Sequence, residues 1–170
     1  AVIPIEGGHF ILADTFRVRD DQAQAAVEEF WHVRQMVDPP MSGSCEHHHD
    51  HVDLHQTASD TLILRPRCSS LVKGTGYAAE GVGQLTGIGL RPGGFLVEND
   101  QITFENQVEA TDVFRRARWA PSQVVADDIR VFVLTAAPSE EGLPTIALAQ
   151  RTCGSDQCFD VVVGDTTYSL

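Results

Sequence analysis

The segment IRVFVLT, residues Ile129–Thr135, constrains the fold more than any other stretch of this 170-residue chain. Four apolar residues, Val131–Leu134, follow one another without a polar interruption. A short unbroken apolar run rich in β-branched residues is typical of a fully buried strand. We therefore predict a central β-strand at Ile129–Thr135 and expect further strands beside it.

Other segments have the composition and alternation of strands. Alternating apolar residues predict a strand at His9–Val18. The dipeptide Asn99-Asp100 is a candidate hairpin turn, and Gly164-Asp165 is another. The remaining predicted strands are Thr61–Arg65, Gly94–Glu98, Gln101–Glu109, Pro144–Gln150, Phe159–Val163 and Thr166–Ser169.

Apolar residues at helical spacing predict one main helix at about 21–37. This apolar face consists of Ala23, Val27, Phe30, Val33 and Val37. Asp21 is a candidate N-terminal cap, and Pro39-Pro40 ends the helix. A second, shorter helix is expected at Thr111–Trp119, with its arginines on a solvated face.

Together these elements predict an α+β, β-rich fold. The expected architecture is an antiparallel sandwich or partly open barrel of about seven strands, with the main helix packed on one face. The length favours a single domain, residues 1–170. Two long connections interrupt the pattern: a His-rich loop at about 39–60 and a Gly-rich connection at about 74–94. Connections of this length are unusual unless they are functional.

The composition excludes some classes of function. The formal net charge is −12, which argues against nucleic-acid binding because phosphate contacts need clusters of Lys and Arg. The apolar runs are far shorter than a membrane span, so membrane insertion is not expected. The N-terminal residues Ala1–Pro4 lack the pattern of a signal peptide. We therefore expect a cytoplasmic or virion location rather than secretion.

Five of the seven histidines fall within the stretch CEHHHDHVDLH, Cys45–His55. Imidazole, thiolate and carboxylate are the side-chain ligands of transition metals. Alternate residues share one side of an extended chain, and residues four apart share one side of a helix, so either backbone allows chelation. The predicted metal ligands are His47, His49 and His51, with His55, Cys45 and Asp53 in reserve. The predicted ion is a divalent transition metal, zinc or iron; the alternative is a solvated loop that binds metal only adventitiously.

Two resemblances concern the same histidines. The stretch His49–His55 resembles the His-x-His-x-Asp-His signature of the metallo-β-lactamase superfamily, which implies a metal-dependent hydrolase, but Leu54 separates Asp53 from His55. The pair His47-x-His49, or His49-x-His51, resembles the His-x-His pairs of trimeric phage tail fibres and spike tips. That second resemblance implies six imidazoles around one iron on a threefold axis.

The four cysteines allow several arrangements. Cys153 and Cys158 have the spacing of a tight disulfide-closed loop. Reduced thiols are one alternative. Another is a zinc site that combines these two residues with Cys45 and Cys68, or with histidines.

The sequence contains no complete catalytic motif. It lacks a Gly-x-Ser-x-Gly elbow, and its glycines match no nucleotide-binding pattern. The leading hypothesis is a non-catalytic structural or assembly subunit of a larger oligomeric particle, of virion or tail type, with protein subunits as partners and a metal-binding His-rich loop. The first alternative is a small metal-dependent enzyme in which Glu46, Asp50 or Asp53 is the general base. The second is a secreted, disulfide-bonded metal-binding module.

Overall fold

The structure is a computed structural model and describes residues 1–17, 29–33, 52–66, 81–103, 111–121 and 127–170. Almost all regular structure in this part of the chain is β, so the expected β-rich character is confirmed. One short 3-10 turn, η2 (Glu140–Gly142), separates β9 from β10. The strands are β1 (Val2–Ile5), β2 (His9–Arg17), β3 (Glu29–Val33), β4 (Val52–Ala58), β5 (Thr61–Pro66), β6 (Val82–Gly89), β7 (Gly93–Thr103), β8 (Thr111–Pro121), β9 (Asp127–Ala137), β10 (Ile146–Cys153), β11 (Asp156–Val163) and β12 (Thr166–Ser169).

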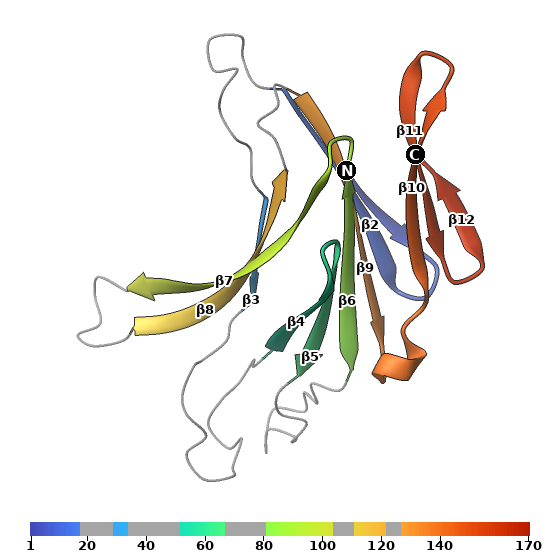
Figure 1. Cartoon of the computed structure of the whole chain (residues 1–170). Helices are drawn as coiled ribbons and strands as arrows, with labels where there is room; N and C mark the ends of the chain where they lie inside the picture. Colours follow the sequence, from blue (N-terminus) through green and yellow to red (C-terminus); the bar gives the residue numbers. More distant parts are fainter. Residues whose placement is uncertain (18–28, 34–51, 67–80, 104–110, 122–126) are drawn as a thin grey trace.

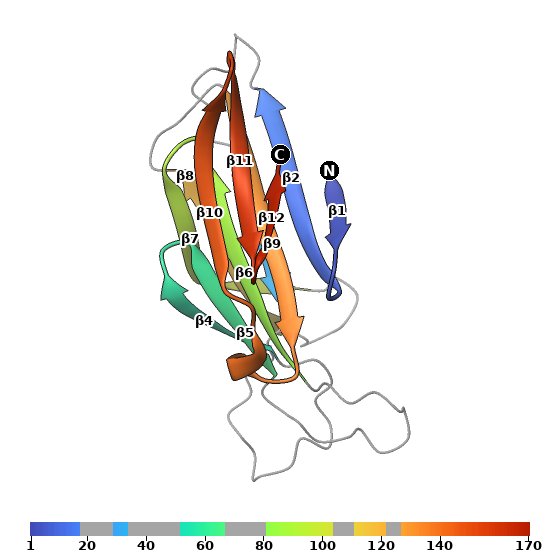
Figure 2. The same ribbon diagram turned by 90° about the vertical axis from the view of Figure 1, so that its right-hand side faces the viewer.

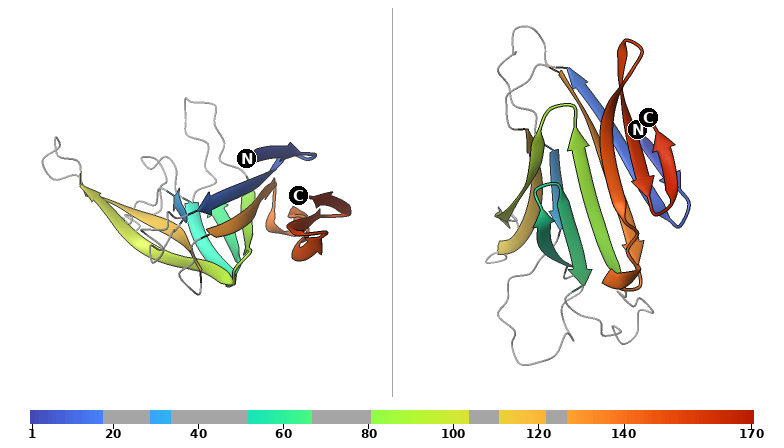
Figure 3. Two further views of the ribbon diagram at one scale, coloured as in Figure 1. Left: turned by 90° about the horizontal axis from the view of Figure 1, so that it is seen from above. Right: turned by 45° about the vertical axis from the view of Figure 1, so that its right-hand side comes forward.

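The strands form three open antiparallel sheets. The central sheet has six strands in the order β1-β2-β9-β6-β5-β4. The sheet β3-β8-β7 lies on one side of it, and the sheet β10-β11-β12 lies on the other (Figure 1). Figure 2 looks onto β10–β12, in front of the central strands, and Figure 3 shows the layers from above. Because β1 and β4 are the two edges of the central sheet, the described strands do not close into a barrel.

Strand β9 explains why three layers form. Val131 and Val133 pack into one core, together with residues of β11 such as Phe159. Phe132, between them, points to the opposite face and packs with Phe95 and Trp119 of the other outer sheet. Side chains alternate across a strand, so an unbroken apolar run supplies both cores at once. The predicted buried central strand is thus confirmed.

The aromatic side of this packing depends on a glycine. Gly87 of β6 lies beside β9, and a Cβ atom there would be 2.8 Å from two ring atoms of Phe132 and 2.9 Å from Cζ3 of Trp119. Both distances are shorter than van der Waals contact. Glycine at this position therefore lets the rings approach the backbone of the central sheet.

The predicted main helix at 21–37 is wrong at residues 29–33. These residues form β3, which pairs with β8 and sends Trp31 against the core ring of Phe132 at a centroid distance of 5.4 Å. Aromatic and β-branched residues favour strands when a neighbouring strand offers pairing and burial. Residues 21–28 and 34–37 lie outside the described residues.

The β7–β8 hairpin corrects two further expectations. The predicted helix at Thr111–Trp119 is wrong, because these residues belong to β8 and pair with β7 over its whole length. The predicted turn at Asn99-Asp100 is also wrong, because β7 continues through it to Thr103. Asn99-Asp100 lacks the glycine that accepts positive φ in a tight hairpin turn.

The two long connections are shorter than expected. Residues 52–58 of the predicted His-rich loop form β4, whereas residues 39–51 lie outside the described residues. In the predicted Gly-rich connection, residues 82–89 form β6 and residues 93–94 begin β7. Strand pairing on both sides of β6 accounts for this difference, since it outweighs the low strand preference of glycine.

Candidate functional site

The structure places two of the six predicted metal ligands. Asp53 and His55 lie two residues apart on β4, an edge strand of the central sheet. Their backbones pair with those of Arg65 and Ile63 on β5. The other four candidates, Cys45, His47, His49 and His51, lie outside the described residues.

The surroundings of His55 fix its backbone. The preceding residue, Leu54, is buried in the aromatic core, whereas the imidazole of His55 is exposed. This opposition follows from the alternation of side chains along a strand. His55 therefore presents its ring to solvent from a strand that the core anchors.

The end of β4 is also attached to the neighbouring sheet. The side-chain amide of Gln56 donates a hydrogen bond of 2.8 Å to the carbonyl of Phe95, on β7. The backbone N–H of Phe95 in turn donates to the carbonyl of Ser59, at 2.7 Å. These contacts attach the C-terminal end of β4 and the turn after it to β7. Among the residues that the structure describes, no group of three or more His, Cys, Asp or Glu side chains is arranged to hold a metal ion.

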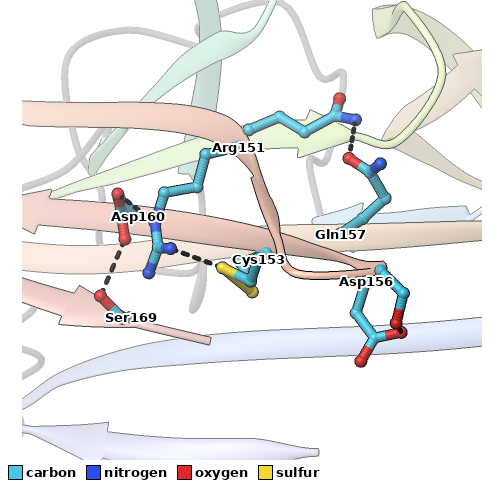
Figure 4. The surroundings of a disulfide bond; sticks show 9 residues. Arg151, Cys153, Asp156, Gln157, Asp160 and Ser169 are labelled. Carbon is cyan, nitrogen blue, oxygen red and sulfur yellow. Dashed lines mark hydrogen bonds and ion pairs between the residues drawn. A yellow bond between two sulfur atoms is a disulfide. The ribbon is translucent and has the colours of Figure 1, made fainter.

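A second polar group lies at the tip of the β10–β11 hairpin, where Cys153 and Cys158 form a disulfide. Of the arrangements that the sequence left open for these two cysteines, the disulfide-closed loop is the one present. Arg151 donates hydrogen bonds to Cys153 Sγ and, at 2.7 Å, to a carboxylate oxygen of Asp160 (Figure 4). The hydroxyl of Ser169, on β12, donates to the other oxygen of Asp160 at 2.8 Å.

Sequence reasoning missed Arg151, Asp160 and Ser169. Their proximity depends on the strand register, which sets Asp160 opposite Ser169. A weak signal was present, because the dyads Arg151-x-Cys153 and Cys158-x-Asp160 lie on either side of the turn. Hydrogen bonds from Arg151 first and Ser169 second hold the pKa of Asp160 below its usual value, so its carboxylate is ionised at neutral pH.

A third charged group lies on the outer face of the β7–β8 hairpin. Both oxygens of Glu98 accept hydrogen bonds of 3.0 Å, one from Arg116 and one from Arg118. Hydrogen bonds from Arg118, and next from Arg116, lower the pKa of Glu98. The Arg cluster predicted on a helix face therefore belongs to a strand pair.

Replacing Glu98 by glutamine is expected to lower the melting temperature slightly at neutral pH. The folded-state pKa of Glu98 is depressed, so its contribution is present above the unfolded-state value and is lost as pH falls through the lower folded-state value. The effect is small because the carboxylate is 34% exposed and salt screens it. Thermal melts of E98Q and of a control, E141Q, at several pH values check this; an E98Q deficit that persists in acid contradicts it.

Within the described residues, the chain is an all-β protein of three stacked antiparallel sheets with a disulfide-closed hairpin. Comparisons of the chain with protein-family models, with curated proteins and with solved structures found no match. In the described part of the chain, no helix is long and apolar enough to cross a membrane.

Proposed function

We propose that this chain is a non-catalytic structural subunit of a larger protein assembly, and that its segment Cys45–His55 binds a divalent transition metal, zinc or iron. The observation that carries the proposal is the position of His55, whose exposed imidazole follows a buried anchor, Leu54, on a strand of the central sheet. A ligand held on a rigid element loses little conformational freedom when it binds a metal.

The remaining ligands come from the residues before β4. His47, His49 and His51 are the first choice, and His55 and Asp53 lie where the same segment joins the sheet. An ion shared between the segment and the strand would tie the segment to the edge of the sheet. Metal binding of this kind contributes directly to folding or assembly free energy.

The opposite edge of the central sheet supports a role in assembly. Val2 of β1 is 65% exposed, and Phe10 of β2 is 41% exposed. Apolar side chains at the edge of an open sheet favour contact with another protein chain. The net charge of −12 favours a partner surface that is neutral or cationic.

Protein purified without a tag or metal column is expected to contain metal in a fixed stoichiometric amount. A His47, His49, His51→Ala triple variant should lose that metal because three of its imidazole ligands are gone. The wild type should lose it as pH falls through the range in which imidazoles take up protons. Elemental analysis combined with mass in solution measures both the metal and the oligomer.

The matched control is His9→Ala, which removes a histidine from β2 and should leave the metal content unchanged. Wild-type protein without stoichiometric metal would reject the metal site. A metal-loaded monomer that hydrolyses esters or amides would instead support the metal-dependent enzyme.

One observation favours a second candidate, a secreted disulfide-bonded metal-binding module. The Cys153–Cys158 disulfide is of a kind that persists mainly in oxidising compartments. Titration of free thiols in denatured, unreduced protein from its native source distinguishes the two. Complete absence of free thiols supports the exported module, and free Cys153 and Cys158 support an intracellular subunit.

A further inference from the structure

The two sulfurs of the Cys153–Cys158 disulfide have different surroundings (Figure 4). The register of the hairpin sets Arg151 opposite Cys158 and Cys153 opposite Asp156, so the disulfide runs diagonally across the strand pair. The guanidinium of Arg151 donates its hydrogen bond to Cys153 Sγ. Both cysteines are half-buried, Cys153 next to the exposed turn Gly154-Ser155 and Cys158 next to the exposed Gln157, so small molecules can reach them.

The guanidinium is held in this position from its other side. Arg151 Nε donates a 2.7 Å hydrogen bond to Asp160, and Ser169 fixes that carboxylate through a 2.8 Å hydrogen bond. The result is a row of a hydroxyl, a carboxylate, a guanidinium and a sulfur, contributed by three neighbouring strands. A disulfide that only closes a hairpin needs no cation oriented toward one of its sulfurs.

A cation next to a sulfur stabilises negative charge on it, and a sulfur that carries charge more easily is a better leaving group in thiol–disulfide exchange. Here the positive charge contacts Cys153, so cleavage that leaves the electron pair on Cys153 is favoured. The incoming thiolate must then attack the other sulfur, Cys158 Sγ.

We propose that this disulfide is a site of exchange with low-molecular-weight thiols, in which Cys158 is the sulfur that becomes thiolated and Cys153 is the leaving group. The incoming thiolate forms a bond to Cys158 Sγ, the Cys153–Cys158 bond breaks, and its electron pair goes to Cys153 Sγ beside Arg151. Attack by the Cys153 thiolate reverses the step and expels the small thiol. Alternatively, a second small thiol attacks the sulfur of the first small thiol in the adduct. This step releases a small disulfide and leaves both cysteines reduced, a transfer of two electrons and two protons.

The test uses the intact oxidised protein with reduced glutathione as the probe. Samples are alkylated at successive times, and peptide mapping by mass spectrometry reports glutathione adducts at each cysteine separately. The adduct is expected on Cys158 in at least about threefold excess over Cys153, with Cys153 alkylated in the same molecules. An excess on Cys153, or equal amounts on both, overturns the proposal.

Variants of Arg151 separate this role from simple stapling of the hairpin. Arg151→Gln should slow adduct formation about three- to tenfold and abolish the preference for Cys158, whereas Arg151→Lys should retain most of both. Arg65→Gln, which removes an arginine of β5 from its exposed ion pair with Glu140 of the η2 turn, is the matched control and should behave as wild type. Arg151→Gln protein that changes only in melting temperature, with the rate and adduct position of wild type, overturns the proposal.

A second thiol excludes attraction of the anionic probe as the cause. The uncharged 2-mercaptoethanol should show the same preference for Cys158 and the same loss in Arg151→Gln. An effect confined to glutathione means that Arg151 only attracts negative charge, and this result also overturns the proposal. The preference in the wild-type protein needs no variant, so the test holds even where Arg151→Gln does not fold.

Discussion

Replacing Phe132 by alanine is expected to lower the free energy of unfolding by about 3–5 kcal/mol. The side chain is fully buried on β9, and its ring meets those of Trp31 and Trp119 edge to face at centroid distances of 5.4 and 5.5 Å. Phe95 completes the group at 6.0 Å. These rings join the central sheet to the sheet β3-β8-β7, so the truncated side chain leaves a cavity between these two layers. Urea denaturation followed by tryptophan fluorescence measures the loss.

Phe10→Ala is the control for this prediction. Phe10 lies on β2, the strand next to β9, and is 41% exposed, so its truncation should cost no more than about 1 kcal/mol. A total stability of about 5–15 kcal/mol is usual for a single domain, so the Phe132 variant should lose a large share of it. Equal losses for the two variants would show that the aromatic cluster does not hold the layers together.

The sequence was most informative where one strand is buried on both faces or where turn chemistry is unambiguous. IRVFVLT predicted β9 because only a doubly covered strand tolerates such a run. The last hairpin was predicted from its turn dipeptide, Gly164-Asp165. In the structure Gly164 has a φ of 59°, a value that glycine adopts readily, and the turn joins β11 to β12. In both places local and tertiary preferences agree.

The outer sheet β3-β8-β7 was not predicted, because local and tertiary preferences conflict there. The spacing of Phe30 and Val33 fits a helix, yet pairing with β8 and the packing of Trp31 make these residues a strand. In β8 the alternation was visible in Arg116–Trp119, with Ala117 and Trp119 buried and both arginines on the outer face toward Glu98. A cluster of three arginines suggested a solvated helix face because the cross-strand carboxylate is distant in sequence.

The candidate sites also differ in whether local sequence or the pairing of distant strands determines them. A His-rich stretch is visible from composition alone, and its prediction as a metal site stays a prediction. The disulfide was one of several arrangements that spacing allowed. The polar row at Cys153 was not predictable, because Asp160 and Ser169 reach Arg151 only through the register of three strands. Geometry between strands is what a single sequence encodes least directly.

Replacing Asp128 by alanine is expected to cost about 3–5 kcal/mol, because it removes one partner of a buried ion pair. The side chains of Asp128 and Arg130 are both 0% exposed and are joined by a 3.0 Å hydrogen bond. The other oxygen of Asp128 accepts from the backbone N–H of Ile129 at 3.0 Å. The ring of Phe16 also lies over this guanidinium, with 4.6 Å between Cζ of Arg130 and the ring centroid, so the charge pair is covered by an aromatic side chain. Denaturant unfolding measures the loss.

A double-mutant cycle shows whether the charge pair itself is responsible. Arg130→Met removes the cation while keeping an apolar side chain, and the double variant with Asp128→Ala should lose less than the sum of the single losses, since each single variant already breaks the same ion pair. Asp14→Ala, on β2 directly opposite Arg130 but 60% exposed, is the matched control and should change stability by about 0.5 kcal/mol or less. Strictly additive losses in the cycle would mean that Asp128 stabilises the protein through its backbone contacts alone. Recovery in the double variant would show that the central sheet carries a charge pair that apolar residues can replace.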